Sequence, residues 1–448
     1  MDARAPALAI AALLATACAP HPPRRGAGAA SPGDDRERSL DAIAETFVKL
    51  ALALGVHDPD EVDAYQGPPE WRKEAEAARI PLDEVERRAE AALAALGPDP
   101  AGGDLEALRR RALSAGLAAI RTRAAVVAGR RLTFDEEARG IYGVVAPRPS
   151  EAELERTAAA IDRALPGDGP LPARLEAFRA RFHVPVDRLR GAVTAAIDEC
   201  RARTLRRLAL PAGESFSLEM VSGKPWGGYN WYQGGFRSVI QVNTDVPTPV
   251  GRVLDIGCHE GYPGHHVFHS LQDERLARER GWKEFLVQPL FGPASLVAEG
   301  SANHGVAVAF PGAEKIEFER RVIWPAAGLD PAEAERYERI EALARGLRYA
   351  RNEAARRLLE GETDPAGAAA WLERHALLSP ARAAQSVRFV QRYRTYVLNY
   401  NYGEDLVRTW VERTGGASAD GRWRAFEALL VVPRTPADLA RGAGGPGP

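Results

Sequence analysis

Histidine and glutamate are concentrated in one part of this 448-residue sequence, where their chemistry suggests metal binding. The stretch DIGCHEGYPGHHVFH and the later EGSANHG together contain His259, Glu260, His265, His266, His269, Glu299 and His304. Five of the nine histidines therefore fall within 46 residues. Hydrolytic zinc sites use about three imidazole or carboxylate ligands and leave one position open for water. The residue types predict a hydrolase in which a carboxylate is the general base for a metal-bound water.

The spacing around His259 departs from the usual zinc helix motif. His259 and Glu260 begin like H-E-x-x-H, in which histidines four residues apart share one helix face, but the fifth position is Pro263. Pro263 removes a backbone donor and Gly264 allows the chain to change direction. In an unbroken helix His266 would lie about 10 Å along the axis from His259. A site that includes His259 therefore requires a broken helix.

Two ligand pairings remain open from the residues alone. A break after Glu260 can bring either His265 or His266 back towards His259. His265 and His269 are a rival pair, because they are four residues apart and need no break.

The surrounding sequence is mostly helical, with one short β-rich region. Leu40, Ile43, Phe47, Leu50 and Leu54 repeat at three- and four-residue steps, with Ser39 as a candidate N-cap. Similar patterns occupy 83–96, 104–123, 150–164, 171–182, 186–207 and most of 250–430, whereas 215–245 is typical of a small sheet. The expected fold class is mostly α, a large multi-helix body with a small β-sheet next to a metal-site helix.

The N-terminus predicts export. Residues 5–17 are apolar but too short to span a bilayer, and Ala15, Thr16 and Ala17 lead into Cys18 as in a bacterial lipobox. We expect a lipoprotein signal peptide at 1–18, a flexible tether at 19–38, one domain at 39–432 and a disordered tail at 433–448. An ordinary secretory signal is the alternative. In a lipoprotein, Cys18 would anchor the protein to the membrane of the cell envelope. Cys200 and Cys258 are expected to be buried thiols, with a disulfide between them as the alternative.

The charge balance excludes one class of partner. Fifty-nine basic and 61 acidic residues leave a net charge of −2. A protein that binds nucleic acid through its overall charge is therefore not expected.

The motif HEGYPGHH resembles the HE-x-x-PGHH signature of domain-of-unknown-function family 885, whose members are exported bacterial proteins and often lipoproteins. That family is similar to zinc metallopeptidases of the gluzincin type. AEGSA at 298–302 resembles both the EGWA segment of the family and the Asn-Glu-Gly-Phe-Ala helix of gluzincin aminopeptidases. Weaker similarities cover 131–143, 229–244 and Tyr400 to Gly403.

The resemblance implies a gluzincin-like fold and one catalytic Zn²⁺. His259 and Glu299 would be zinc ligands and Glu260 the general base. The second ligand would be His265, with His266 as the alternative. Ser301 stands where the family has Trp and would reshape the pocket, and His304 would be an additional ligand or proton donor.

Two further assignments concern substrate binding. Tyr400 is the first candidate for a donor to the developing oxyanion, followed by Tyr396, Tyr402 and Arg392; the alternative is that these tyrosines are core packing. The strand at 236–243 is either a plain core strand or an edge that pairs with an extended peptide.

These features predict a zinc-dependent, peptidase-like hydrolase that acts on a peptide or amide carbonyl. The main alternative is a binding or structural lipoprotein that keeps the scaffold without turnover. Two further alternatives are a structural metal site and a metal-free hydrolase that uses Asp255 or Glu260 with histidine.

Overall fold

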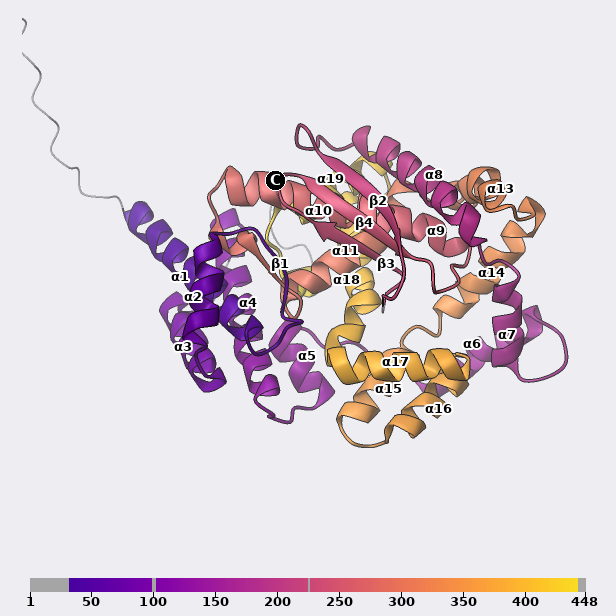
Figure 1. Cartoon of the computed structure of the whole chain (residues 1–448), viewed down its shortest axis with the longest axis horizontal. Coiled ribbons are helices and arrows are strands. Elements are labelled where there is room, and N and C mark those ends of the chain that lie inside the picture. The colour runs from indigo at the N-terminus through magenta and orange to yellow at the C-terminus, as the bar shows by residue number, and fades with distance from the viewer. Residues whose placement is uncertain (1–31, 99–101, 225, 442–448) are drawn as a thin grey trace, which may run out of the picture. The chain divides into compact units, whose positions relative to one another are not determined.

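A computed structural model describes residues 32–98, 102–224 and 226–441 of the chain (Figure 1). The chain divides into residues 1–39 and a second unit from Leu40 onward. The second unit consists mostly of helices with two small sheets, which confirms the expected fold class. Within the described residues, no helix combines the length and apolar character needed to cross a membrane. The expected signal peptide, including Cys18, lies outside the described residues.

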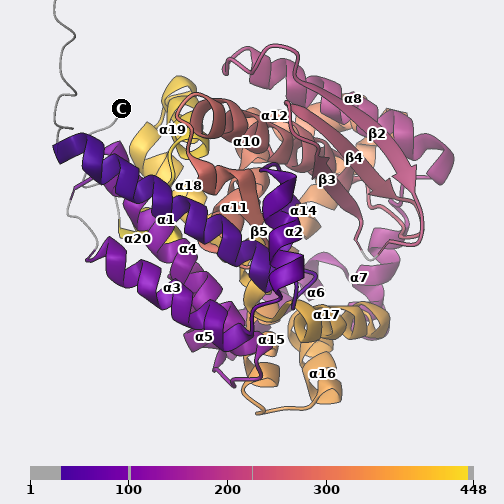
Figure 2. The ribbon, with the colours of Figure 1, turned by 60° about the vertical axis from the view of Figure 1, so that its left-hand side comes forward.

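The N-terminal helices form where the apolar repeat predicts them. Leu40, Ile43, Phe47, Leu50 and Leu54 are all buried, and α3 and α4 lie side by side (Figure 2). The helices are α1 (Pro32–Gly55), α2 (Pro69–Ala78), α3 (Leu82–Leu96), α4 (Leu105–Val127) and α5 (Phe134–Tyr142). The expected tether is wrong for residues 32–38, because these residues already belong to α1. Ser39 consequently lies inside the helix and does not cap it.

Three more helices lead into the main sheet. They are α6 (Glu151–Ala164), α7 (Leu171–Ala180) and α8 (Val186–Leu205), close to the expected ranges. Ser150 begins α6 with a capping box, in which its side chain accepts a hydrogen bond from the Glu153 amide and the Glu153 side chain binds the Ser150 amide.

The main sheet has three strands in the order β2, β4, β3. Its strands are β2 (Ser215–Val221), β3 (Gly228–Tyr232) and β4 (Arg237–Asn243). β4 pairs in parallel with β2 and antiparallel with β3, so the hypothesis that residues 236–243 form a free peptide-binding edge is wrong. The edge strand beside the site is β3, which contacts the helix that carries His259. A second sheet pairs β1 (Val62–Tyr65) with β5 (Val287–Pro289), and the sequence patterns did not predict it.

The site lies on a succession of short helices and one longer helix. These are α9 (Gly251–Ile256), η1 (Gly257–Gly261), α10 (His265–Gln272), η2 (Asp273–Arg278), η3 (Lys283–Leu286) and α11 (Pro293–Ala309). η1 and η2 are single turns of π-helix, in which the backbone hydrogen bonds span five residues.

The C-terminal helices complete the core around α11. They are α12 (Glu314–Phe318), η4 (Glu319–Ile323), α13 (Trp324–Ala327), η5 (Pro331–Glu333), α14 (Ala334–Arg345), α15 (Ala350–Leu359), α16 (Pro365–His375), α17 (Pro380–Tyr393), η6 (Arg394–Tyr400), α18 (Tyr402–Gly415), α19 (Ala419–Val431) and α20 (Pro436–Arg441). The expected disordered tail is wrong up to residue 441, because Pro436 and Leu439 of α20 are buried. Residues 442–448 lie outside the described part.

Candidate metal centre

The helix that carries His259 is interrupted as the metal hypothesis requires. η1 ends at Gly261 and α10 begins at His265. At the turn the Gly264 amide donates to the carbonyl oxygen of Cys258 over 3.0 Å. A Cβ atom at Gly264 would lie 1.9 Å from the carbonyl oxygen of His259, so this close approach requires glycine. The turn brings His265 beside His259.

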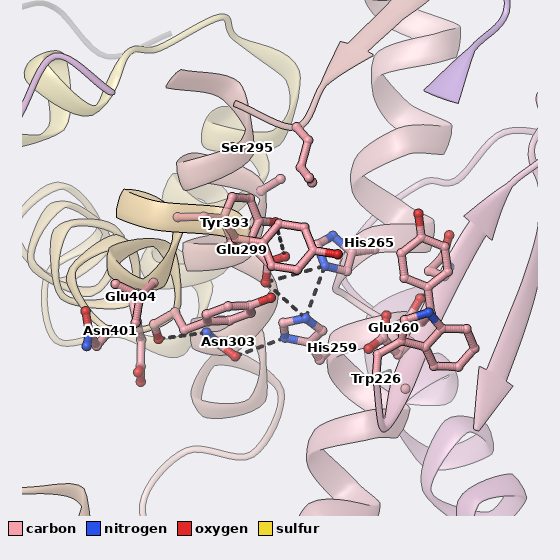
Figure 3. Close-up of a pocket in the computed structure, with 18 of the residues that line it drawn as sticks. Trp226, His259, Glu260, His265, Ser295, Glu299, Asn303, Tyr393, Asn401 and Glu404 are labelled. Carbon is pink, nitrogen blue, oxygen red and sulfur yellow. Dashed lines mark hydrogen bonds and ion pairs between the residues drawn. The ribbon is translucent and has the colours of Figure 1, made fainter. Parts of the chain in front are cut away.

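Three ligand atoms converge at this break (Figure 3). His259 Nε2 lies 3.1 Å from His265 Nε2 and 3.3 Å from Glu299 Oε2, and His265 Nε2 lies 3.9 Å from the same oxygen. Glu299 Oε2 is buried and accepts no hydrogen bond from any described residue. Two imidazoles and one carboxylate with converging free atoms fit a metal ion, and the cluster can hold one.

Neighbouring side chains orient two of these ligands. Nδ1 of His259 lies 3.0 Å from Asn303 Oδ1, an arrangement in which Nδ1–H donates and Nε2 keeps its lone pair for a metal. Asn303 in turn donates to the carbonyl oxygen of Tyr400 over 3.0 Å, and the Tyr396 hydroxyl donates to Glu299 Oε1 over 2.9 Å. Sequence reasoning missed Asn303, although its position four residues after Glu299 places both on one face of α11.

The electrostatics of Glu299 and His265 favour ligation. Burial raises the pKa of Glu299, but the adjacent His259 and His265 and the hydrogen bond from Tyr396 outweigh it and lower that pKa to about 2. Burial, reinforced by the charge of His259, lowers the pKa of His265 to about 4. A carboxylate that stays ionised and an imidazole that stays neutral are the forms that bind metals.

Glu260 lies directly beside the ligand cluster and under β3 (Figure 3). Asn230 of β3 donates to the Glu260 carbonyl oxygen over 2.6 Å, and a Cβ atom at Gly228 would lie 3.2 Å from Glu260 Oε1. Glu260 is 6% exposed. Burial raises its pKa to about 7, close to the value that suits a general base at neutral pH.

The other histidines of the window lie outside the three-ligand cluster. His266 is fully buried on the opposite side of α10, with Nδ1 2.8 Å from Ser238 Oγ and Nε2 2.9 Å from Glu214 Oε2. His269 stacks on His265 at 5.9 Å and lies 2.7 Å from Gln288 Nε2. His304 is buried on α11.

The tyrosine-rich segment approaches the cluster because two helices cross closely. A Cβ atom at Gly300 of α11 would lie 2.4 Å from the backbone of Gly403 in α18, so both positions depend on glycine. Tyr400 is 43% exposed and lines the cavity. Desolvation within the cavity, followed by the charges of Glu299 and Glu260, raises the pKa of Tyr400, so its hydroxyl stays protonated and able to donate.

The alternatives to Tyr400 have other contacts. Tyr396 holds Glu299, and Arg392 binds Asp60 through two hydrogen bonds of 2.7 and 2.8 Å. Tyr402 is half-buried and packs against the core. Ser301 is also buried, donates to the carbonyl oxygen of Ala298 and is not among the residues that line the cavity.

The cluster opens into a large cavity of about 1770 Å³. His259, Glu260, His265 and Glu299 all line it. Three aromatic residues of the β3 region line it as well: the ring of Tyr229 stacks on Trp226 and meets Trp231 edge-on. The cavity is large enough for a substrate of several residues.

A disulfide joins Cys258 to Cys200, so the expectation of two buried thiols is wrong. The Cα atoms are 5.6 Å apart, and the bond ties η1 to α8 immediately before His259. Gly257 supports this approach, because a Cβ atom there would lie 2.9 Å from Ala196 Cβ. The sequence shows Cys200 and Cys258, but only the packing of α8 on η1 shows that they meet.

Comparison with known proteins identifies structures that resemble this one but no protein family that matches its sequence. The sequence matches no protein-family model, and it has no match among the curated proteins. A protein from Colwellia psychrerythraea assigned as a lipoprotein is 14% identical, with a TM-score of 0.51 over 83% of this chain and 72% of that one. This likeness shows a shared fold.

Two further solved structures are more distant. A protein of unknown function from Shewanella oneidensis, also assigned as a lipoprotein, is 12% identical with a TM-score of 0.44 over 92% of this chain and 78% of that one. An M32 carboxypeptidase from Deinococcus radiodurans R1 is 13% identical with a TM-score of 0.35, over 90% and 92% respectively.

Proposed function

We propose that this protein is a zinc-dependent, peptidase-like hydrolase of a peptide or amide bond. The observation that carries the proposal is the convergence of His259, His265 and Glu299 beside the buried carboxyl group of Glu260 in one cavity. The motif HEGYPGHH and its similarity to family 885 support the same assignment.

The donor set favours zinc. Two imidazole nitrogens and one carboxylate oxygen are the ligands of catalytic zinc sites with an open fourth position. When bound there, zinc polarises a carbonyl group and lowers the pKa of water to about 7. Softer metals would favour thiolate ligands, and Cys258 is held in a disulfide.

The residues around the ligands have distinct roles in this proposal. Glu260 accepts the proton of the attacking water and later delivers it to the leaving nitrogen. Tyr400, whose hydroxyl stays protonated beside Glu299, donates to the oxygen on which negative charge develops. The edge of β3 that is free of strand pairing can bind an extended substrate through its backbone, with Trp226 and Trp231 in contact with its side chains.

A substitution of the general base tests this function. Glu260→Gln is expected to keep the zinc and lose hydrolysis of a peptide library by about 10²- to 10⁴-fold, because the amide cannot accept the proton. Glu76→Gln, an exposed glutamate of α2, is the matched control. Equal turnover in Glu260→Gln and wild type would refute the assigned base. A zinc-loaded wild type without turnover on any peptide or amide would instead support a binding or structural lipoprotein.

We also propose that the protein is exported and anchored to the cell envelope through Cys18. The lipobox-like sequence before Cys18 supports this, as does the disulfide, because such bonds persist in oxidising compartments. The lipoprotein assignment of the structurally similar C. psychrerythraea protein agrees with it. Cys18→Ala is expected to move the protein from the membrane fraction to the soluble fraction, and an unchanged distribution would contradict lipidation.

A further inference from the structure

Four of the arginines that line the cavity containing the metal-ligand cluster come from four different helices. They are Arg179 of α7, Arg252 of α9, Arg351 of α15 and Arg382 of α17. Arg351 is exposed within the cavity, where desolvation lowers its pKa and the charges of Arg382, Arg179 and Arg252 lower it further. Each of the other three guanidinium groups is therefore near enough to repel that of Arg351.

Three of these arginines have acidic partners. Glu341 accepts two hydrogen bonds from Arg179, at 2.7 and 3.0 Å. Glu176 lies 3.5 Å from Arg382, and Asp255 lies 3.5 Å from Arg252. The two longer contacts are weak and leave N–H groups of Arg382 and Arg252 available.

Arg351 has no such partner. No side-chain hydrogen bond or ion pair joins its guanidinium group to any residue that the structure describes, although the side chain is accessible from the cavity. The guanidinium group of Arg351 therefore has no carboxylate partner among the described residues. A cation that faces a cavity among other cations is stabilised when an anion binds there.

The helix that carries His259 relates this arginine group to the metal site. Arg252 and His259 lie on the continuous stretch formed by α9 and η1 and are seven residues apart. Seven residues correspond to about 10 Å along the axis, and both Arg252 and His259 line the cavity. An extended peptide covers about 3.3 to 3.6 Å per residue, so about three residues span this distance.

We propose that Arg351, assisted by Arg252 and Arg382, binds the C-terminal carboxylate of a peptide substrate whose scissile bond lies about two or three residues earlier. The proposal rests on the hydrolase function above. A guanidinium group matches a carboxylate with two parallel hydrogen bonds, which fixes both the position and the orientation of the peptide end. The subsite would make the protein an enzyme that removes short C-terminal fragments.

Matched peptides test the subsite. Two peptides of one sequence, one with a free C-terminal carboxylate and one with a C-terminal amide, are compared in kcat/KM on the zinc-loaded protein. The wild type is expected to prefer the acid by about 10- to 100-fold, as for a hydrogen-bonded ion pair in a cavity. Mass spectrometry is expected to show released fragments of two or three residues.

Substitutions then assign the preference to the arginine group. In Arg351→Gln the ratio of kcat/KM for the acid to kcat/KM for the amide is expected to fall to near one. Arg351→Lys keeps the positive charge but cannot form the two parallel hydrogen bonds, so its ratio should be intermediate. Arg382→Gln is a second variant in case Arg351→Gln does not fold. Arg424→Gln, an exposed arginine of α19 outside the cavity lining, is the control and should keep the ratio. Equal kcat/KM for acid and amide in the wild type would overturn the subsite.

Two further measurements distinguish a C-terminal carboxylate from an acidic side chain, and distinguish failure of the subsite from failure of the hydrolase proposal. An effect of Arg351→Gln that appears only with C-terminal amides containing an internal Glu would overturn the C-terminal assignment in favour of an acidic side chain. Calorimetric binding of both peptides to Glu260→Gln measures the same preference without turnover. If no peptide is hydrolysed but the acid binds more tightly and the preference requires Arg351, the subsite stands and the hydrolase proposal fails.

Discussion

His265 and His266 are consecutive residues with different environments, and the difference decides which of them can bind a metal. His265 faces His259 and Glu299, with its Nε2 atom among the converging ligand atoms. His266 is held by Ser238 and Glu214 in the interior. One residue corresponds to a rotation of about 100° around a helix. The choice between them therefore depended on where α10 restarts, which residue types cannot reveal.

At the residue scale, the hydrogen bond from Tyr396 to Glu299 should tighten metal binding. We expect Tyr396→Phe to raise the zinc dissociation constant by about 10- to 100-fold, because Glu299 loses the partner that orients it. Competition with a chromophoric chelator measures this. Tyr393→Phe is the control, since Tyr393 lines the cavity without a hydrogen bond to Glu299. Equal zinc affinity in the two variants would contradict the role of Tyr396.

Glu214 gives a prediction about stability in acid. Burial raises its pKa, but hydrogen bonds from His266, Tyr262 and Arg201 outweigh burial and lower the pKa from 4.5 to about 2. A folded-state pKa below the unfolded value contributes stability above about pH 4.5, and this contribution is lost as the pH falls towards 2. Wild type should therefore exceed Glu214→Gln by up to about 3 kcal/mol in unfolding free energy at pH 6.

Urea unfolding at a series of pH values checks this prediction. The difference in unfolding free energy between wild type and Glu214→Gln should become smaller between pH 4.5 and 2. The control Glu76→Gln should have the unfolding free energy of wild type at every pH. A difference that stays constant down to pH 2 would show that the ionised carboxylate of Glu214 is not its source.

At the element scale, the disulfide joins the helix of the metal ligands to α8. Cys200 and Cys258 are 58 residues apart, and closing a loop of this length in the unfolded chain stabilises the fold by about 4 kcal/mol in the chain-entropy model. We expect the double variant Cys200→Ser/Cys258→Ser to lose about 2 to 4 kcal/mol and to bind zinc more weakly, because Cys258 precedes His259. Denaturant unfolding and chelator competition measure the two effects.

A reductant is the internal control for that experiment. It should lower the stability of wild type and leave the double variant unchanged. An equal response of both proteins would mean that the reductant acts elsewhere, and unchanged stability in the double variant would contradict the structural role of the bond.

Helices were easier to predict than the sheet, for a physical reason. The spacing of apolar residues within a short stretch of sequence is enough to predict a helix such as α8. Its predicted range of 186–207 therefore agrees with Val186–Leu205. The place of a strand in a sheet depends on partners far away in the sequence. Ser238, Ile240 and Val242 of β4 alternate with more exposed residues as an edge strand also would, so the pattern could not place β4 in the centre.

At the scale of the whole molecule, the site is assembled from segments that the sequence separates. Glu299 is forty residues after His259, and the Tyr400 segment is a further hundred residues away, yet α11 packs against both η1 and η6. The composition of the His and Glu window was enough to predict a metal site. The cavity and its arginines were not predictable, because Arg179, Arg252, Arg351 and Arg382 meet only through the packing of four helices.

The zinc content of the purified protein tests the central claim most directly. Mass spectrometry of the metal in wild type, His259→Ala, His265→Ala and the control His57→Ala compares the two cluster histidines with one outside the cavity. The structure predicts one zinc per chain in wild type and in His57→Ala, and none in the two cluster variants. A folded wild type that takes up no zinc, or full zinc occupancy in His265→Ala, would contradict the metal centre described above.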